Sequence, residues 1–419
     1  MYKSYVRQIE YTYVTKIPGP KAIKHVEQFK KIAYDSTFTY PLVIKTGRGC
    51  EIEDVDGIKF LDFTSNIGSC PLGYSHPEIL DVIKDYSSIE KGVNKIAGQD
   101  FYCEEHFTIA KKLLSISKKS SKVFFINSGA EAVENAIKIA YKKMGPLPGV
   151  SCYSDFHGRT LGALSFTLSK EVQKTNFPEL PVKRIKFCTV DSDPQINQLE
   201  SVLKEYKVAF ILTEIIQGEG GLNVASKLFI QNIRKLADEY NVPLIFDEVQ
   251  SGMGRTGKWW VYEHYGVEPE IMTVAKALQV GATVYDKKYE PTESGVLSST
   301  WGGGSRIDMA IGSKIIEIIM KDNLLSNSQK IGNMLLKNFV DLVGINGLID
   351  ARGIGLMIGL EFDTKMIRDN IVNRLFKKGL LVLPSGIKSI RIMPPLIVNE
   401  EEAMKGISTI NDTINEYNK

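Results

Sequence analysis

Two ionisable residues of this sequence each follow an apolar run. Asp247 ends the run Leu-Ile-Phe-Asp, and Lys276 follows Ile-Met-Thr-Val-Ala. A carboxylate at the end of a buried strand is tolerated only when it is paired, so Asp247 either holds a cationic nitrogen or caps the turn that follows. A buried lysine has a lowered pKa and can act as nucleophile and base, although Lys276 could instead extend its amine from the strand end to solvent.

A third stretch, Asn-Ser-Gly-Ala at 127–130, has residue types that suit an anion. It lies between an apolar run at 123–126 and a helical pattern near 130–144. Ser128 and Glu131 fit a capping box, and the small residues leave backbone N–H groups open at the positive end of the helix dipole. By itself, this pattern also fits an ordinary capped helix.

Together, the three stretches predict one cofactor. Pyridoxal phosphate needs an anion cradle, a carboxylate for its pyridinium nitrogen and a lysine for its Schiff base. Asp247 would face the pyridine nitrogen and keep it protonated, and Lys276 would carry the cofactor.

The segment Gly252–Gly257 carries another motif, Gly-x-Gly-x-x-Gly, which also occurs in dinucleotide-binding proteins. Here no helical pattern follows at once, and no acidic residue lies at the expected distance beyond the motif. We therefore expect a glycine-rich loop beneath the cofactor pocket rather than a dinucleotide site.

The elements that must position these residues alternate between strand and helix patterns. Predicted strands lie at 123–126, 209–215, 243–249 and 271–275, with helical patterns between them, including 230–240. Apolar strands that alternate with amphipathic helices predict a mostly parallel sheet covered by helices. Ligands of such sheets bind outside the carboxyl ends of the strands, which is where both ionisable residues fall.

The two ends of the chain have a different pattern. Alternating segments flank Asp56-Gly57 within 51–63, which is a strong hairpin signal. The C-terminal part predicts strands at 355–362, 380–384 and 389–393, a helix near 365–379 and a last helix from about 399. We therefore predict an α/β fold with a large cofactor-binding domain at 66–320 and a smaller α+β domain built from 1–65 and 321–419. A groove between two such domains is a natural ligand site.

The composition is that of a soluble globular protein. The chain has 419 residues, 43% apolar and 24% charged, with a net charge of +3, so nothing suggests nucleic acid as a partner. Its five cysteines form no Cys-x-x-Cys pair, which favours a reducing compartment. Because no signal peptide, long apolar span or zinc-type spacing is apparent, we expect a cytoplasmic protein without a metal or a membrane partner.

Several ordered motifs resemble those of the class III (ω-)aminotransferases, which are fold-type-I pyridoxal phosphate enzymes. The motifs are NSGAEAVENAIKIA, FHGRTLGALSFT, EIIQGEGG, IFDEVQSGMGRTGKWW and SSTWGGG, together with the residues around Lys276. The resemblance extends from about residue 35 to about residue 410 and is strongest to 4-aminobutyrate aminotransferase. It implies a homodimer with shared active sites. It also implies ping-pong transfer of the terminal amine of a 4-aminobutyrate-like ω-amino acid to 2-oxoglutarate, giving a semialdehyde and glutamate.

The resemblance also implies roles for residues of the cofactor site. Lys276 and Asp247 would be catalytic, with Lys276 moving the proton of the amine-bearing carbon. The residues that would bind the cofactor are Ser128, Gly129, Ala130, Phe156, His157, Asp247, Val249, Gln250, Lys276 and Thr300. Among these, Phe156 would stack on the pyridine ring unless it only packs in the core. Thr300 would reach the phosphate of the neighbouring subunit.

Four charged residues would bind the substrates. Arg159 resembles the arginine that binds the distal carboxylate of 4-aminobutyrate, and Arg391 the one that binds the α-carboxylate of 2-oxoglutarate or glutamate. Glu219 would neutralise Arg391 when the donor offers no α-carboxylate there. Either arginine could instead form a structural ion pair, and Glu214 could contact the amine substrate or only close a strand.

Some residues depart from the family pattern. Lys276 precedes Ala-Leu-Gln-Val-Gly where Gly-Leu-Gly-Gly-Gly is frequent, the segment 282–296 is polar and atypical, and Trp301 replaces a frequent phenylalanine. These changes leave the substrate open. Ornithine, N-acetylornithine or lysine could be the donor, and an amino-acid racemase or epimerase could use the same scaffold. A binding protein that has lost its activity is disfavoured because Lys276 and Asp247 are both present.

Overall fold

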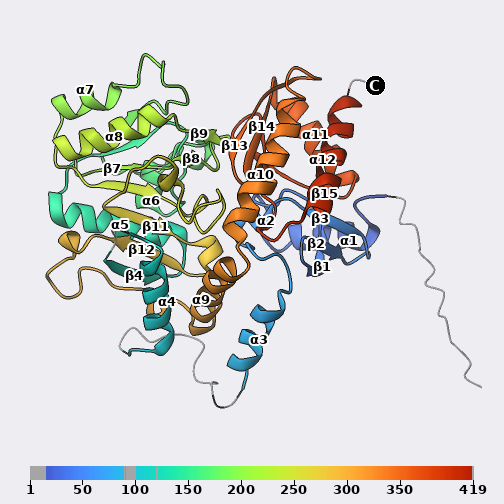
Figure 1. The fold of residues 1–419 in the computed structure, drawn as a ribbon, viewed down its shortest axis with the longest axis horizontal. Helices are drawn as coiled ribbons and strands as arrows, with labels where there is room; N and C mark the ends of the chain where they lie inside the picture. The colour runs from blue at the N-terminus through green and yellow to red at the C-terminus, as the bar shows by residue number, and fades with distance from the viewer. Residues whose placement is uncertain (1–15, 89, 91–100, 119–120, 418–419) are drawn as a thin grey trace, which may run out of the picture.

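The structure, a computed structural model, describes residues 16–88, 90, 101–118 and 121–417. In Figure 1 a large sheet with its covering helices lies on the left, and two smaller sheets with the C-terminal helices lie on the right. Residues 1–15 of the predicted small domain lie outside the described residues. Within the described part, no helix is long and apolar enough to cross a membrane.

The large sheet has seven strands. In spatial order they are β4 (Lys122–Ile126), β12 (Gly281–Tyr285), β11 (Ile271–Val274), β10 (Leu244–Asp247), β7 (Phe210–Thr213), β5 (Gly149–Cys152) and β6 (Val182–Ile185). β12 is antiparallel to both of its neighbours, and every other pair is parallel. The predicted α/β fold with a mostly parallel sheet is confirmed. β12, which overlaps the first residues of the atypical segment, was not predicted.

Helices cover both faces of this sheet, because side chains of a strand alternate between its faces. In β10, Ile245 packs on one face, and Leu244 and Phe246 pack on the other. The first core includes residues of α5 (Gly129–Met144) and α6 (Leu161–Phe166). The second includes residues of α4 (Glu104–Ser115), α8 (Lys227–Glu239) and α9 (Arg306–Lys321). Burial on both faces explains why these strands are continuous apolar runs, and the predicted helices at 130–144 and 230–240 correspond to α5 and α8.

Two four-stranded sheets bring distant parts of the chain together. One has the order β1 (Ile44–Arg48), β2 (Glu51–Asp54), β3 (Lys59–Asp62), β15 (Leu380–Leu381), and the other β13 (Leu348–Ile354), β14 (Met357–Phe362), β17 (Ser389–Ile392), β16 (Leu383–Ser385). The predicted hairpin is confirmed, since β2 and β3 are antiparallel and Gly57 has a φ of 82° at the turn. β3 pairs in parallel with β15, so the N-terminal and C-terminal segments share one sheet. The domain boundaries stay a prediction.

The predicted strand at 380–384 is in fact two short strands, β15 and β16, which belong to different sheets. Val382 lies between them. Its N–H donates to the hydroxyl of Tyr40 at 3.3 Å, and that hydroxyl donates to the Val382 carbonyl. A side chain therefore takes the place of a neighbouring strand at this residue, which is why the strand is interrupted.

The remaining elements are short or peripheral. Helices α10 (Leu324–Val340) and α11 (Lys365–Lys377) pack against the second small sheet. Helix α12 (Glu400–Asn415) packs against these two helices. The other elements are α1 (Pro20–Lys30), α2 (Ser65–Gly68), α3 (Pro77–Tyr86), α7 (Gln198–Glu205), β8 (Ile216–Gln217) and β9 (Asn223–Val224). The helices predicted near 365–379 and from about 399 are confirmed as α11 and α12.

Candidate active site

Five parallel strands of the large sheet end at one edge, and a chemically active segment follows each end. These segments are Asn127–Ala130 after β4, Asp155–Arg159 after β5, Glu214 after β7, Asp247 at the end of β10, and Lys276 after β11. The parallel arrangement alone brings them together, because the carboxyl ends of parallel strands meet at the same edge. They surround a cavity of about 560 Å³, which is within the usual size of a small-molecule site.

Most of the predicted site residues line this cavity. They are Ser128, Gly129, Ala130, Phe156, His157, Arg159, Glu214, Glu219, Asp247, Val249, Gln250 and Lys276. Thr300 and Arg391 do not line it, although Arg391 contacts Glu219 and Gln250, which do. The sequence patterns did not assign the other lining residues, which are Ile67, Ser69, Asn127, Gly158, Ala275, Gln279 and Val280.

The first turn of α5 forms an anion cradle. Ser128 is the N-cap of this helix, and its Oγ accepts the N–H of Glu131 at 3.3 Å and donates to the Glu131 carboxylate at 2.9 Å. A Cβ on Gly129 would lie 2.8 Å from Cγ1 of Val249, so the close approach of the two segments requires glycine. The cavity therefore opens onto free backbone N–H groups at the positive end of a helix dipole.

Lys276 carries an amine that is free to react. Its backbone is left-handed, with a φ of 47°, and its amine makes no hydrogen bond or ion pair with the described residues. Burial, and next the charge of Arg391, lowers its pKa to about 8, although Glu219 and Asp247 act in the opposite direction. A lysine of this kind is a usable nucleophile and base near neutral pH.

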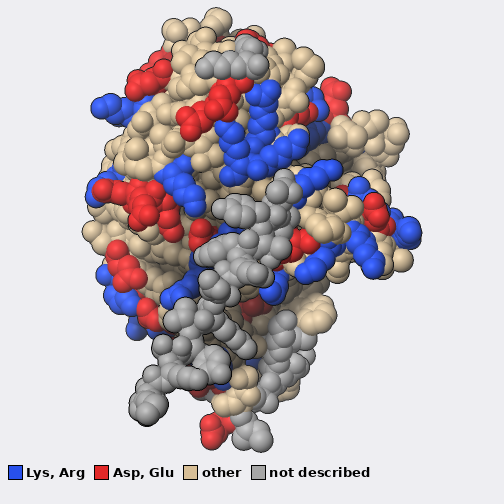
Figure 2. Space-filling view, turned by 90° about the vertical axis from the view of Figure 1, so that its right-hand side faces the viewer, with Lys and Arg blue, Asp and Glu red and all other residues tan. Residues whose placement is uncertain are grey.

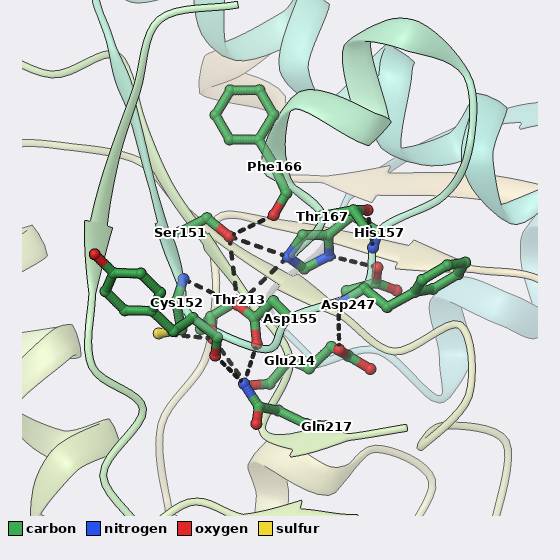
Figure 3. A network of polar contacts seen from close by, with 12 residues as sticks. Ser151, Cys152, Asp155, His157, Phe166, Thr167, Thr213, Glu214, Gln217 and Asp247 are labelled. Carbon is green, nitrogen blue, oxygen red and sulfur yellow. Dashed lines mark hydrogen bonds and ion pairs between the residues drawn. The ribbon is translucent and has the colours of Figure 1, made fainter. Parts of the chain in front are cut away.

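Asp247 caps the following turn and also faces a histidine, whereas its contact with the pyridine nitrogen of a cofactor stays a prediction. Its Oδ1 accepts the N–H of Val249 and the hydroxyl of Thr273, each at 3.0 Å. Its Oδ2 lies 2.9 Å from Nδ1 of His157, which is fully enclosed (Figure 3). These three contacts hold the carboxylate in one orientation at the cavity wall.

Asp155 completes this network and was missed by the sequence patterns. It is buried, and its Oδ2 lies 3.4 Å from Nε2 of His157. Although burial opposes it, the hydrogen bonds of Asp155 and Asp247 raise the pKa of His157 to about 10. The ring of His157 thus lies between two acids, and both favour its protonated form.

Glu214 is held by backbone groups near the cavity. One carboxylate oxygen accepts the N–H of Phe156 at 2.8 Å, and the other accepts the N–H of Gly218 at 2.9 Å. Burial, followed by the charge of Asp155, raises its pKa to about 8. Its position ties the segments after β5 and β7 together, and a contact with the amine substrate stays a prediction.

Arg391 and Glu219 form an ion pair beside the cavity. Nη1 of Arg391 donates to Oε1 of Glu219 at 2.6 Å, to Oε1 of Gln250 at 3.0 Å and to the carbonyl of Gly218 at 2.9 Å. Burial opposes ionisation of Glu219, but the charges of Arg391 and Lys276 lower its pKa. The Nε of Arg391 is buried and has no hydrogen-bond partner in the described part of the chain.

Arg159 and Phe156 form the outer wall of the cavity. The guanidinium of Arg159 lies over the Phe156 ring, 5.6 Å from its centroid, and its side chain is exposed. Within the described residues Arg159 makes no ion pair, so the structural alternative considered for it does not apply there. An exposed cation at the mouth of the cavity is available to an anionic ligand.

Thr300 lies beside α5 of its own chain. Its hydroxyl donates to Glu131 at 2.6 Å, and the side-chain amide of Asn127 donates to its carbonyl at 2.8 Å. That Thr300 contacts the phosphate of a neighbouring subunit stays a prediction.

The glycine-rich segment Gly252–Gly257 lines no part of the cavity. It forms buried turns followed by a short 3-10 helix at Val261–His264, and its expected place beneath the cofactor pocket stays a prediction. Its Arg255 donates to the carbonyl of Pro394 and to Oγ of Ser65, which ties the loop to residues beside the small sheets.

The cavity fits the cofactor predicted from the sequence. Pyridoxal phosphate requires an anion cradle, a carboxylate and a free amine around one ring-sized space. The cradle at Ser128–Ala130, the oriented Asp247 and the amine of Lys276, unpaired among the described residues, all line the same cavity.

Comparisons with known proteins agree with this site. The family model described as aminotransferase class-III matches residues 33–414. The chain is 36% identical over 393 residues to the acetylornithine aminotransferase of Methanocaldococcus jannaschii, covering 90% of this chain and 95% of that protein. It is 37% identical over 394 residues to the acetylornithine aminotransferase of Prochlorococcus marinus, covering 90% and 92%.

Solved structures are similar over almost the whole chain. The lysine aminotransferase of M. tuberculosis superposes with a TM-score of 0.86 at 25% identity, covering 93% of this chain and 98% of that one. The ornithine aminotransferase of Toxoplasma gondii superposes with a TM-score of 0.86 at 23% identity, covering 95% and 96%, and this likeness supports the fold.

Proposed function

Because this chain belongs to the class III aminotransferases, we propose that it transfers the terminal amino group of N-acetylornithine to 2-oxoglutarate. Enzymes of this family depend on pyridoxal phosphate, and so does this chain. The curated relatives described above are acetylornithine aminotransferases. They favour N-acetylornithine, one of the donors left open by the sequence, over the 4-aminobutyrate that the sequence favoured.

The residues at the strand ends would hold the cofactor. The first turn of α5, at Ser128–Ala130, would bind the phosphate, Asp247 would face the pyridine nitrogen, and Phe156 would cover the ring. When bound, pyridoxal phosphate withdraws electrons from the carbon that bears the substrate amine. All other tasks fall to side chains of this protein.

Lys276 would move the proton. Its amine faces the cavity, and its pKa of about 8 lies close to neutral pH, so it can accept a proton from the amine-bearing carbon and return it. The neighbouring Arg391 helps to keep the pKa of this amine low.

The observation that carries the substrate proposal is the state of Arg391. Its guanidinium is buried and paired with Glu219, yet one N–H has no partner in the described residues. Because Glu219 neutralises Arg391, the pair can lie beside the uncharged carbon chain that carries the terminal amine of the donor. When Glu219 moves away, the same guanidinium can bind the α-carboxylate of 2-oxoglutarate. One pocket then accepts two substrates of different charge in turn.

Arg159 favours the acetylated donor. N-acetylornithine carries its carboxylate far from the reacting amine, where the exposed guanidinium of Arg159 can bind it. Its α-nitrogen is acetylated and uncharged. Ornithine would instead bring an ammonium group towards the cation of Arg159, which is unfavourable.

The active unit would be a homodimer. Several large apolar side chains are exposed around α4 and the segment that follows Thr300, namely Phe101 (78%), Tyr102 (105%), Phe107 (69%) and Trp301 (68%). A second copy of the chain would cover them.

A donor panel tests the proposed function. N-acetylornithine, ornithine, lysine and 4-aminobutyrate are each incubated with 2-oxoglutarate, and the glutamate formed is measured. We expect the highest kcat/KM for N-acetylornithine. A higher value for 4-aminobutyrate or lysine would overturn the choice of donor. Racemisation of a single amino acid without an oxo-acid, with no glutamate formed from any donor, would overturn the transferase assignment and favour a racemase.

A further inference from the structure

The ring of His157 lies between two carboxylates. Figure 3 shows Asp247 on the side of Nδ1 and Asp155 on the side of Nε2. The atom pairs are 2.9 Å and 3.4 Å apart, and all three side chains are buried. Asp247 ends β10, and Asp155 lies in the turn that follows β5. In the sheet, β7 lies between these two strands.

This geometry requires a proton on each ring nitrogen while both acids are ionised. An ionised carboxylate only accepts hydrogen bonds, so a lone pair on Nε2 facing Asp155 would be repelled. The hydroxyl of Ser151 lies 3.5 Å from both Nε2 of His157 and Oδ2 of Asp155, but its single proton has its shortest contact, 2.9 Å, with the carbonyl of Phe166. A neutral imidazole therefore does not satisfy the site.

The surroundings of Asp155 present hydrogen-bond donors to both of its carboxylate oxygens. Its Oδ1 accepts from Nε2 of Gln217 at 2.8 Å, and its Oδ2 accepts the N–H of Cys152 at 3.1 Å. Asp155 thus acts as an acceptor on every side.

We propose that Asp155 is a positioning residue that keeps His157 an imidazolium, and that this imidazolium holds Asp247 as an oriented carboxylate towards the cofactor. The inference rests on the proposed role of Asp247. Asp155 itself does not line the cavity and acts only through His157. The raised pKa of His157, to about 10, agrees with this arrangement.

Other ionisable groups surround this cluster from each neighbouring element. They are Cys152 on β5, Arg184 on β6, Glu214 after β7 and Lys276 after β11. Burial, followed by the charge of Asp155, raises the pKa of Glu214 to about 8, whereas the charge of His157 lowers it. Asp155 and Asp247 remain the acids in direct contact with the ring.

Nitrogen NMR of the full-length protein, labelled with 15N-histidine and freed of cofactor, tests the first step. The chain has 5 histidines, and His157→Gln assigns the signal of His157. We expect both ring nitrogens to stay protonated up to a midpoint of about 10, and Asp155→Asn to lower that midpoint by more than about one pH unit. A wild-type midpoint near that of free histidine would overturn the proposal, even if the variant does not fold. An unchanged midpoint in Asp155→Asn would also overturn it.

The pH dependence of cofactor binding tests the second step. We expect pyridoxal phosphate to bind Asp155→Asn at least about tenfold more weakly than wild type at alkaline pH, with a smaller difference at acid pH where His157 is protonated in both. Glu248→Gln is the control, because Glu248 follows β10 and is as buried as Asp155 but contacts Ser251 and the N–H of Tyr262 rather than His157. A pH-independent loss, equal in both variants, would overturn the proposal.

The two failures are distinguishable. If Asp247→Asn binds the cofactor as tightly as wild type, the proposed role of Asp247 fails, whereas the nitrogen titration still reports whether Asp155 holds the proton on His157.

Discussion

Glu219 accepts a hydrogen bond of 2.6 Å from Nη1 of Arg391, and the Nε of the same guanidinium has no partner in the described residues. Glu219→Gln removes the negative charge but keeps an acceptor. We expect the KM for 2-oxoglutarate to fall, because Arg391 is no longer neutralised, and kcat/KM for the terminal-amine donor to fall by about tenfold. Separate half-reactions with each substrate measure this. Equal effects on both substrates would contradict the gating role.

Lys276→Ala removes the amine that faces the cavity. We expect turnover to fall by at least about 10²–10⁴, since a positioned proton-transfer group contributes that much, and the visible absorbance of the bound cofactor to change. Lys287→Ala, an exposed lysine after β12, is the control and should keep full activity. Wild-type turnover in Lys276→Ala would rule out its role.

Arg159→Gln removes the exposed cation over Phe156. We expect the KM of N-acetylornithine and of 2-oxoglutarate to rise by roughly tenfold to a hundredfold, which is the usual strength of a hydrogen bond to a charged group, while kcat changes little. Steady-state kinetics with each substrate varied measure this. If Arg159 only packs on Phe156, both KM values will stay within about twofold of wild type.

Gln279 combines a strained backbone with two stabilising contacts. Its φ is 67°, and its side-chain amide donates to the carbonyl of Ser69 at 2.7 Å and to that of Lys276 at 3.0 Å. Gln279→Ala keeps the strain and loses both hydrogen bonds, so we expect a loss of about 2 kcal/mol in the free energy of unfolding. Gln279→Gly relieves the strain and should be more stable than the alanine variant by about 1 kcal/mol. Denaturant unfolding of the two variants measures the difference, and equal stabilities would contradict the strain.

The raised pKa of His157 makes stability depend on pH. The folded protein holds a proton that the unfolded chain releases near 6.5, so this contribution is complete below that pH and is lost as the pH rises through about 10. Glu214 and Lys276 also titrate in this window. We therefore compare cofactor-free wild type with His157→Gln. The difference in their free energies of unfolding should shrink between these pH values, and a constant difference would contradict the shift.

The sequence was sufficient to predict the site residues that lie at the ends of apolar strands. Asp247 and Lys276 could be predicted to converge, because each ends a strand of a mostly parallel sheet. Asp155 could not, because it lies in a polar turn without a periodic pattern. Asp155 contacts the nearby His157 within the same turn, and the contact of His157 with Asp247 depends on the order β10, β7, β5, which no local pattern specifies.

The walls of the cavity depend on backbone conformations that the residue types disfavour. Ile67 lines the cavity from α2, where it has a φ of 63°, a value that a β-branched residue rarely adopts. Gln279, which lies beside Lys276, also has a positive φ, of 67°. The interruption of the predicted strand at Val382 depends on Tyr40, a residue far away in the chain. Such features are imposed by tertiary contacts rather than by local preference.

The parallel pairing of β3 with β15 also constrains how the chain is made in the cell. Translation is vectorial, so the first hairpin leaves the ribosome long before Leu380 and Leu381 are synthesised. Until then its open edge has no permanent neighbour and could pair with other nascent chains. Final assembly of this sheet is thus a post-translational event, and chaperones that shield exposed strands would act during that interval.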